Sequence, residues 1–147
     1  MLLEGRTAII YGGSGAVGGA VAKAFAREGA RVVLVARTEP KLRALGEEIR
    51  RAGGEAEWDV VDATDHVAVE AHVEAVARRA GPIRLMFNAV SLDDTQGTPL
   101  TAMSREKFIA PIVTAMQTWF STGTIMARHM AENGGGTIIG ISANAAR

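Results

Sequence analysis

The sequence predicts an α/β fold in which helices cover both faces of a doubly wound parallel sheet. Two observations predict it. Short apolar segments alternate with segments whose apolar residues recur at helical spacing, which is typical of strand–helix–strand units with right-handed crossovers. Residues 31–36 form an uninterrupted apolar run, as expected for a parallel strand buried on both faces. With 147 residues the length suits one domain, which we expect to span residues 1–147.

Glycine, proline and capping residues mark the ends of the expected helices. Gly29 stops a helix expected over residues 16–28. Thr38 can cap the next helix, and Pro40 suits its first turn because the missing N–H costs nothing there. Gly53-Gly54 ends that second helix. A third helix is expected over residues 65–79, and strands are expected over residues 6–11, 31–36, 55–61, 83–88 and 137–142.

The last third of the chain predicts one long helix. After a polar loop at 91–101, a short helical turn begins at Ser104 and is expected to break before Pro111, because proline disfavours the α region for the residue before it. The long helix then runs to about Glu132. Its apolar residues lie nearly all round, so we expect the sheet to cover one face and a second subunit the other. These residues are Ile112, Val113, Met116, Trp119, Phe120, Ile125, Met126 and Met130.

A cluster of glycines connects the first strand to the first helix. Gly13, Gly15 and Gly18 have the spacing of the dinucleotide fingerprint. Such a turn aims free backbone N–H groups and the positive end of the helix dipole at one point, where a phosphate can bind. A purely structural glycine turn is the alternative interpretation. The candidate cofactor-binding residues of this turn are Gly12, Gly13, Ser14, Gly15, Ala16, Val17 and Gly18.

Arg37 directly follows the second strand and is the candidate determinant of cofactor choice. In an open parallel sheet the ligand lies beyond the carboxyl ends of the strands. An acidic residue at this point would bind the ribose hydroxyls of NAD, whereas a guanidinium can hold the additional phosphate of NADP. Thr38 is a candidate second donor to that phosphate. The alternative interpretation is a solvated arginine after a strand.

The third and fourth strands end in further candidate cofactor-binding residues. Asp62, with Ala63 beside it, could accept a hydrogen bond from the adenine amino group or could simply start the next helix, and these two roles are compatible. Asn88, with Ala89 beside it, could connect neighbouring strand ends or contact the ribose.

Composition disfavours several kinds of partner and site. The net charge is zero and there is no basic run, so neither nucleic acid nor an anionic membrane is a favoured partner. We expect no signal peptide, and no apolar run reaches membrane-spanning length. The absence of cysteine excludes disulfides and thiolate chemistry and agrees with a cytoplasmic location. His66, His72 and His129 lack metal-ligand spacing, so we expect surface histidines and no metal site.

With these elements placed, the chain resembles the short-chain dehydrogenase/reductase family over nearly its whole length. Tyr11–Gly18 corresponds to the family's Thr-Gly-x-x-x-Gly-x-Gly, Asp62 to its adenine-contacting aspartate, and Phe87–Val90 to its Asn-Asn-Ala-Gly. Residues 136–143 correspond to the strand that carries the catalytic serine.

This resemblance implies a Rossmann-type sheet of about five strands in the order 3-2-1-4-5. It implies hydride transfer between a nicotinamide and a carbonyl or alcohol substrate, with a preference for NADP through Arg37. It also implies a homodimer or homotetramer built partly on the long helix from Pro111.

The glycine turn and the fourth strand depart from the family pattern. In the turn the middle glycine is replaced by Ala16, although Gly15 beside it can serve the same purpose. Val90 replaces a glycine close to where the nicotinamide would lie, and it adds bulk there.

The expected catalytic positions depart further. Ala115 stands at the helix asparagine and Ala143 at the catalytic serine, with Ser142 one residue early as the single catalytic candidate. The Tyr-x-x-x-Lys pair is absent, since Tyr11 is the only tyrosine. The sequence therefore suggests the front portion of a longer enzyme or a divergent member. A non-catalytic NADP(H)-binding sensor or regulatory module, and an interaction protein without a ligand, remain as alternatives.

Overall fold

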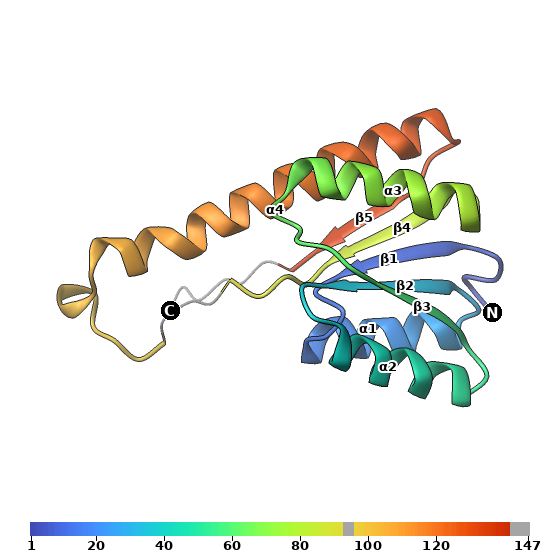
Figure 1. The fold of residues 1–147 in the computed structure, drawn as a ribbon, viewed down its shortest axis with the longest axis horizontal. Coiled ribbons are helices and arrows are strands. Elements are labelled where there is room, and N and C mark those ends of the chain that lie inside the picture. Colours follow the sequence, from blue (N-terminus) through green and yellow to red (C-terminus); the bar gives the residue numbers. More distant parts are fainter. Residues whose placement is uncertain (93–95, 142–147) are drawn as a thin grey trace.

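The computed structural model of the chain describes residues 1–92 and 96–141 and contains a five-stranded parallel sheet in the order β3-β2-β1-β4-β5. This arrangement confirms the predicted fold class and strand order (Figure 1). The elements are β1 (Thr7–Tyr11), α1 (Ala16–Arg27), β2 (Arg31–Ala36), α2 (Glu39–Arg51), β3 (Glu55–Val60), α3 (His66–Ala80), β4 (Ile83–Asn88), the short 3-10 helix η1 (Leu100–Ala102), α4 (Arg105–Glu132) and β5 (Thr137–Gly140).

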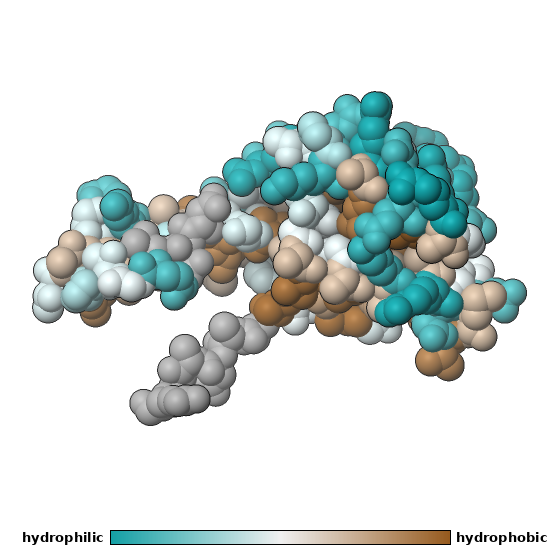
Figure 2. Space-filling model, turned by 90° about the horizontal axis from the view of Figure 1, so that it is seen from below, coloured by the Kyte–Doolittle hydropathy of each residue, from teal (hydrophilic) through white to brown (hydrophobic). Residues whose placement is uncertain are grey.

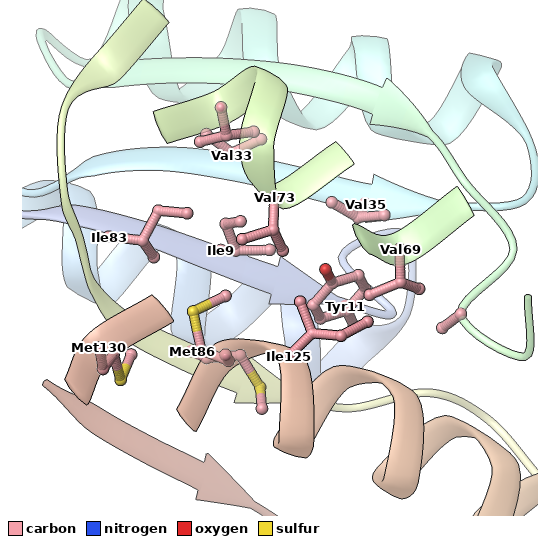
Figure 3. Packing of buried hydrophobic residues seen from close by; sticks show 13 residues of the cluster. Ile9, Tyr11, Val33, Val35, Val69, Val73, Ile83, Met86, Ile125 and Met130 are labelled. Carbon is pink, nitrogen blue, oxygen red and sulfur yellow. The ribbon is translucent and has the colours of Figure 1, made fainter. Parts of the chain in front are cut away.

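The sheet separates two layers of helices, each packed on its own apolar core. Helices α1 and α2 cover one face of the sheet, and α3 and α4 cover the other (Figure 1). Alternate residues of the central strand β1 serve the two cores: Ala8 and Ile10 face α1 and α2, whereas Ile9 and Tyr11 face α3 and α4 (Figure 3). Strand β2 is buried from Val32 to Val35, as its uninterrupted apolar sequence predicts.

Helix α4 runs through Pro111 without interruption, so the predicted break before that residue is wrong. Ser104 is the N-cap, and its Oγ accepts a hydrogen bond from the Lys107 backbone N–H at 3.3 Å. Pro111 removes one backbone hydrogen bond early in the helix. Residues 105–110 are exposed, so water can satisfy the carbonyl that proline leaves without a donor.

The apolar residues of α4 meet different surroundings along the length of the helix. Ile125, Met126 and Met130 are buried against the sheet. Residues 105–117 extend past the end of the sheet, where Ile112 and Met116 are about half exposed or more. We call η1 and residues 105–117 of α4 the arm, and Figure 2 shows it projecting from the body of the molecule with hydrophobic residues among the polar ones. Cover of the arm by a second subunit stays a prediction.

Other element ends differ from the sequence prediction by a residue or two. β5 ends at Gly140 and not at Ser142, which lies outside the described residues. Thr38 occupies the N-cap of α2, as predicted, but its side chain makes no capping hydrogen bond. Asp65 caps α3 by accepting a hydrogen bond from the Ala68 N–H at 3.0 Å, so Asp62 does not start that helix.

Two of the three histidines are not surface residues, contrary to the sequence prediction. His72 is buried beneath α3, and its Nε2 lies 3.0 Å from Asp59 Oδ2. His129 is partly buried, and its Nε2 accepts the Ile83 backbone N–H at 3.1 Å. Burial lowers the pKa of His129. His66 is exposed, as predicted. The polarity of histidine alone predicts exposure, but each of these two imidazoles has a hydrogen-bond partner that compensates for its burial.

A charged network connects β3 with α3. Arg79 donates hydrogen bonds to Glu57 and Asp59, and Arg31 donates to Glu57 from the neighbouring strand. Burial opposes ionisation of Glu57, but the hydrogen bonds and charges of the two arginines outweigh it and lower its pKa. The hydrogen bond with His72, with that of Arg79, lowers the pKa of Asp59 despite partial burial. These carboxylates are therefore more acidic in the folded chain than in the unfolded one.

Arg79→Met should reduce the free energy of unfolding at pH 7 by about 1 kcal/mol, because it removes two ion pairs of partly exposed groups. Because the carboxyl pKa values are lower in the folded chain, ionisation of these groups stabilises the fold fully at pH values above their pKa in the unfolded chain, about 4. This stabilisation is lost as the pH falls through their pKa values in the folded chain. Urea unfolding between pH 7 and pH 2.5 should show the difference from the wild type shrinking below about pH 4. Arg43→Met, which removes an exposed pair with Glu39, is the control and should cost less than about 0.5 kcal/mol. A difference that is constant with pH would contradict the network.

Candidate functional site

A cavity of about 450 Å³ lies at the carboxyl ends of β3, β2, β1 and β4. This is the edge at which a doubly wound sheet binds its ligand. Eight of the predicted site residues line the cavity: Gly12, Ser14, Gly15, Arg37, Thr38, Asp62, Ala63 and Ala89. Five others do not line it: Gly13, Ala16, Val17, Gly18 and Asn88. The fold therefore brings residues from four separate strand ends to one place.

The turn after β1 is held by its own backbone hydrogen bonds. Gly12 adopts φ = +76°, a conformation that a side chain would strain. The N–H groups of Gly12 and Gly13 both donate to the Val35 carbonyl, at 2.8 and 3.1 Å, and the Gly15 N–H donates to the Gly12 carbonyl at 3.0 Å. These three glycines shape the turn, and their amides are already engaged.

Two glycines of this turn are required by close backbone contacts. A Cβ on Gly12 would overlap the carbonyl group of Ala89, and a Cβ on Gly18 would overlap the carbonyl group of Gly12. The glycine spacing placed Gly18 among the phosphate-binding residues, and the structure shows that it also lets α1 approach β1. Gly13 packs on Leu34, since a Cβ on Gly13 would lie 3.2 Å from the Leu34 Cβ.

The first turn of α1 presents backbone donors beside the cavity. An α-helix leaves its first N–H groups without intrahelical partners, which here belong to Ala16, Val17 and Gly18. Gly15 at the N-cap has no side chain that could accept their hydrogen bonds. The helix dipole adds partial positive charge at this end. The turn is thus suited to an anion such as a diphosphate.

Arg37 and Asp62 lie near one another at the ends of β2 and β3. Arg37 is exposed on the cavity wall. The Asp62 carboxylate accepts hydrogen bonds from the Thr64 N–H at 2.9 Å and the Thr64 hydroxyl at 2.7 Å. These bonds, followed by the positive charge of Arg37, lower the pKa of Asp62 against a small opposing effect of burial. Asp62 is therefore a fixed, ionised acceptor at neutral pH.

Asn88 bonds to a helix and to its own following turn, a role that its place in the sequence does not indicate. It is buried and outside the cavity lining, and its Nδ2 donates to the Thr122 hydroxyl oxygen on α4 at 3.1 Å. Its Oδ1 accepts the Val90 backbone N–H at 3.1 Å. The side chain thus points into the α4 layer and away from the neighbouring strand ends.

Several residues that line the cavity were not among the predicted site residues. Thr114 and Gln117 come from α4, and Thr64 and Ser91 follow β3 and β4. The two α4 residues reach the cavity because the helix continues past the end of the sheet. Both residues fall within the long helix that the sequence predicts, but their local sequence does not indicate that this part of the helix lies beside the strand ends. The others are Tyr11, Val35, Ala36, Val61 and Val90.

Tyr11, at the family's threonine position, extends into the core below α3 (Figure 3). Its ring meets the His72 ring edge-on, with centroids 6.3 Å apart. Burial raises the pKa of its phenol well above the ordinary value, and its hydroxyl has no hydrogen-bond partner among the described residues. Tyr11 is consequently unsuited to donate a proton at neutral pH. Ser142 and Ala143 lie outside the described residues.

Residues 6–147 match the family model described as short chain dehydrogenase. The chain belongs to the short-chain dehydrogenase family. Among curated members, gluconate 5-dehydrogenase of Gluconobacter oxydans is 34% identical over 95% of this chain and 54% of its own length. The 7alpha-hydroxysteroid dehydrogenase of Clostridium sardiniense is 32% identical, with the same coverage of both chains. The chain thus spans about half the length of these relatives.

Solved structures of the family superpose on nearly the whole chain. A metagenomic short-chain oxidoreductase in complex with NADP gives a TM-score of 0.87 at 33% identity, covering 99% of this chain and 65% of the other. The actinorhodin polyketide ketoreductase with NADPH gives 0.82 at 29% identity, covering 94% and 53%. These likenesses agree with the Rossmann-type sheet found here.

Membrane spans and metal clusters are both absent from the described residues. No helix there has both the length and the apolar composition needed to cross a membrane. Nor do residues 1–92 and 96–141 bring together three or more histidine, aspartate or glutamate side chains that could hold a metal ion. The cytoplasmic location expected from the sequence stays a prediction.

Gly18→Ala should lower the free energy of unfolding by about 1–3 kcal/mol, because the added methyl group would overlap the Gly12 carbonyl and force α1 away from the turn. Gly123→Ala is a matched control, since Gly123 is also a helical glycine but has open space around its Cβ position. We expect that control to raise stability by about 0.5–1 kcal/mol. Chemical unfolding of both variants gives the measurement, and equal effects would show that Gly18 is not required by the contact.

Proposed function

We propose that this chain forms the cofactor-binding part of an NADP(H)-dependent oxidoreductase that transfers a hydride between a nicotinamide and a carbonyl or alcohol substrate. One observation carries the proposal: the same cavity is bounded by the glycine turn at the start of α1 and by Arg37 at the end of β2. Each feature recognises a different phosphate of the same dinucleotide. The NADP and NADPH in the two solved relatives support this assignment.

The residues of the cavity, together with the start of α1 beside it, fit such a cofactor. The backbone N–H groups of Ala16, Val17 and Gly18 would bind the diphosphate, since no side chain at the N-cap competes for them. Arg37 would hold the additional phosphate through a charge-assisted hydrogen bond, with Thr38 as a second donor. Asp62, ionised and fixed by Thr64, would accept from the adenine amino group, with Ala63 beside it.

When bound, the nicotinamide would supply the hydride, and the residues of this chain would hold the nicotinamide in position. Ala89 and Val90 would form the cavity wall at the end of β4, which β1 separates from the end of β2 that carries Arg37. Carbonyl reduction also needs a proton donor tuned near neutral pH. Tyr11 does not meet this requirement, because burial raises its pKa further. The proton therefore comes from a group other than Tyr11, and the substrate stays unassigned.

A non-catalytic NADP(H) sensor is the second candidate, favoured by Ala115. This residue stands on α4 where the family resemblance expects an asparagine, and its methyl side chain can neither donate nor accept a hydrogen bond. Titration with NADPH, followed by nicotinamide fluorescence, tests binding for both candidates. Oxidation of NADPH with a panel of carbonyl compounds then separates them: turnover supports the oxidoreductase, and binding without turnover supports the sensor. Failure to bind NADPH or NADH would overturn both.

Arg37→Ala should weaken NADPH binding by about 1.5–3 kcal/mol and leave NADH binding nearly unchanged, because only NADPH carries the additional phosphate. Isothermal titration calorimetry with both nucleotides gives the comparison. Arg43→Ala removes another exposed arginine from the neighbouring helix α2 and should affect neither nucleotide. Equal losses for NADPH and NADH in Arg37→Ala would show that Arg37 binds no phosphate.

We also propose that the chain associates through α4 as a homodimer or homotetramer. Ile112, Val113, Met116 and Phe120 leave between 45% and 64% of their area exposed on this helix. Surfaces with so many neighbouring apolar side chains are typical of protein interfaces. A second copy of the same helix would bury them.

Met116→Lys should shift the oligomer toward the monomer, because it places a charge within the proposed apolar interface. Sedimentation equilibrium across a concentration series measures the association. Leu2→Lys changes a residue that is 85% exposed and bonded to Glu28 at the end of α1, on the other face of the sheet from α4, so that control should keep the wild-type oligomeric state. A wild-type chain that is monomeric throughout the series would contradict the proposal.

A further inference from the structure

A buried threonine of α4 is bonded to the turn that follows β4. Thr122 has no exposed surface, and its hydroxyl oxygen accepts a hydrogen bond from Asn88 Nδ2 at 3.1 Å. The same hydroxyl donates to the Thr118 carbonyl at 2.7 Å. At the other end of the amide, Asn88 Oδ1 accepts the Val90 N–H at 3.1 Å. A continuous series of hydrogen bonds thus runs from the helix backbone to Val90.

The direction of each bond in this series is fixed by hydrogen count. A threonine hydroxyl has one proton, and Thr122 gives it to the Thr118 carbonyl, so only its lone pairs face Asn88. The Asn88 amide must therefore turn its NH₂ group toward the helix. Its oxygen is then directed at the Val90 N–H. The opposite orientation would place oxygen against oxygen at Thr122 and N–H against N–H at Val90.

The turn held in this way forms part of the candidate site. Ala89 and Val90 both line the cavity. The Ala89 carbonyl lies where a Cβ on Gly12 would be, and the Ala89 N–H donates to the Tyr11 carbonyl at 2.8 Å. A small displacement of the turn would therefore change both the cavity wall and the support of the glycine turn.

We infer that Thr122 is a positioning residue for dinucleotide binding, acting through Asn88 on the turn at Ala89 and Val90. The inference rests on the proposed function. Thr122 does not line the cavity, so its proposed effect is indirect. Because Arg37 follows β2 and the Ala89–Val90 turn follows β4, with β1 between them, Thr122 affects binding of the part of the dinucleotide beyond the adenosine.

Thr122→Val tests the inference, because valine has nearly the shape of threonine but cannot accept the Asn88 hydrogen bond. Two ligands separate the halves of the cavity: NADPH, and adenosine 2′,5′-bisphosphate, which carries the additional phosphate but no nicotinamide half. We expect NADPH affinity to fall about tenfold and the bisphosphate affinity to stay within about twofold of the wild type. Hydrogen–deuterium exchange of the Val90 amide should become faster. Thr122→Ser restores the hydroxyl and should restore both results.

Thr118→Val is the matched control. Thr118 is a second buried threonine of α4, but within the described part of the chain its hydroxyl bonds only to the Ala115 carbonyl of the same helix, at 3.1 Å. This variant should bind both ligands like the wild type. If Thr122→Val fails to fold, Thr122→Cys takes its place, since a thiol is a weaker acceptor and should give the same loss in smaller measure.

The outcomes separate this inference from the proposed function. Wild-type NADPH affinity in Thr122→Val, or equal losses for the two ligands, would overturn the positioning role while leaving the proposed function standing. A wild-type chain that binds neither ligand would overturn the proposed function, and the role of Thr122 in binding with it.

Discussion

Direct backbone contact at two glycines, which carry no side chain, determines the geometry of the candidate site. Gly12 lies against the Ala89 carbonyl, and Gly18 lies against the Gly12 carbonyl, so β1, β4 and α1 meet at one closely packed point. The Gly12 and Gly13 amides donate to Val35 and add β2 to the same assembly. The amides of the first turn of α1 are therefore held in position before any anion binds, which lowers the entropic cost of binding.

The fold and about half of the cavity lining could be predicted because parallel strands end at one edge of the sheet. Residues that follow apolar runs, such as Arg37 and Asp62, must lie together once the strand order is known. The errors arise where other contacts override local signals. Pro111 predicts a break, but the exposed start of α4 tolerates the proline and the helix is continuous from Arg105. His72 is polar, yet Asp59 supplies a partner that allows its burial. Each error depends on exposure to solvent or on a partner residue distant in sequence. The spacing of apolar residues along the chain indicates neither.

Helix α4 shows that one apolar pattern can combine two environments. Apolar residues on all sides of a helix predict that other elements pack on its opposite faces at the same position along its length. Here Ile125 and Met126 are buried on the sheet, whereas Ile112 and Met116 lie about two turns or more toward the N-terminus, beyond the end of the sheet. The two environments therefore follow one another along the helix. Only the first is a core within this chain, and the second is the surface proposed as an interface.

Buried polar groups on the α3 and α4 side of the sheet differ in how completely they are hydrogen-bonded. The Tyr11 hydroxyl and His72 Nδ1 have no hydrogen-bond partner among the described residues. Such groups each cost about 1–3 kcal/mol, which the burial of the aromatic rings can offset. In contrast, both ends of the Asn88 amide are bonded. Packing suffices where a side chain only fills the core, whereas directional bonds hold the turn whose position the cavity depends on.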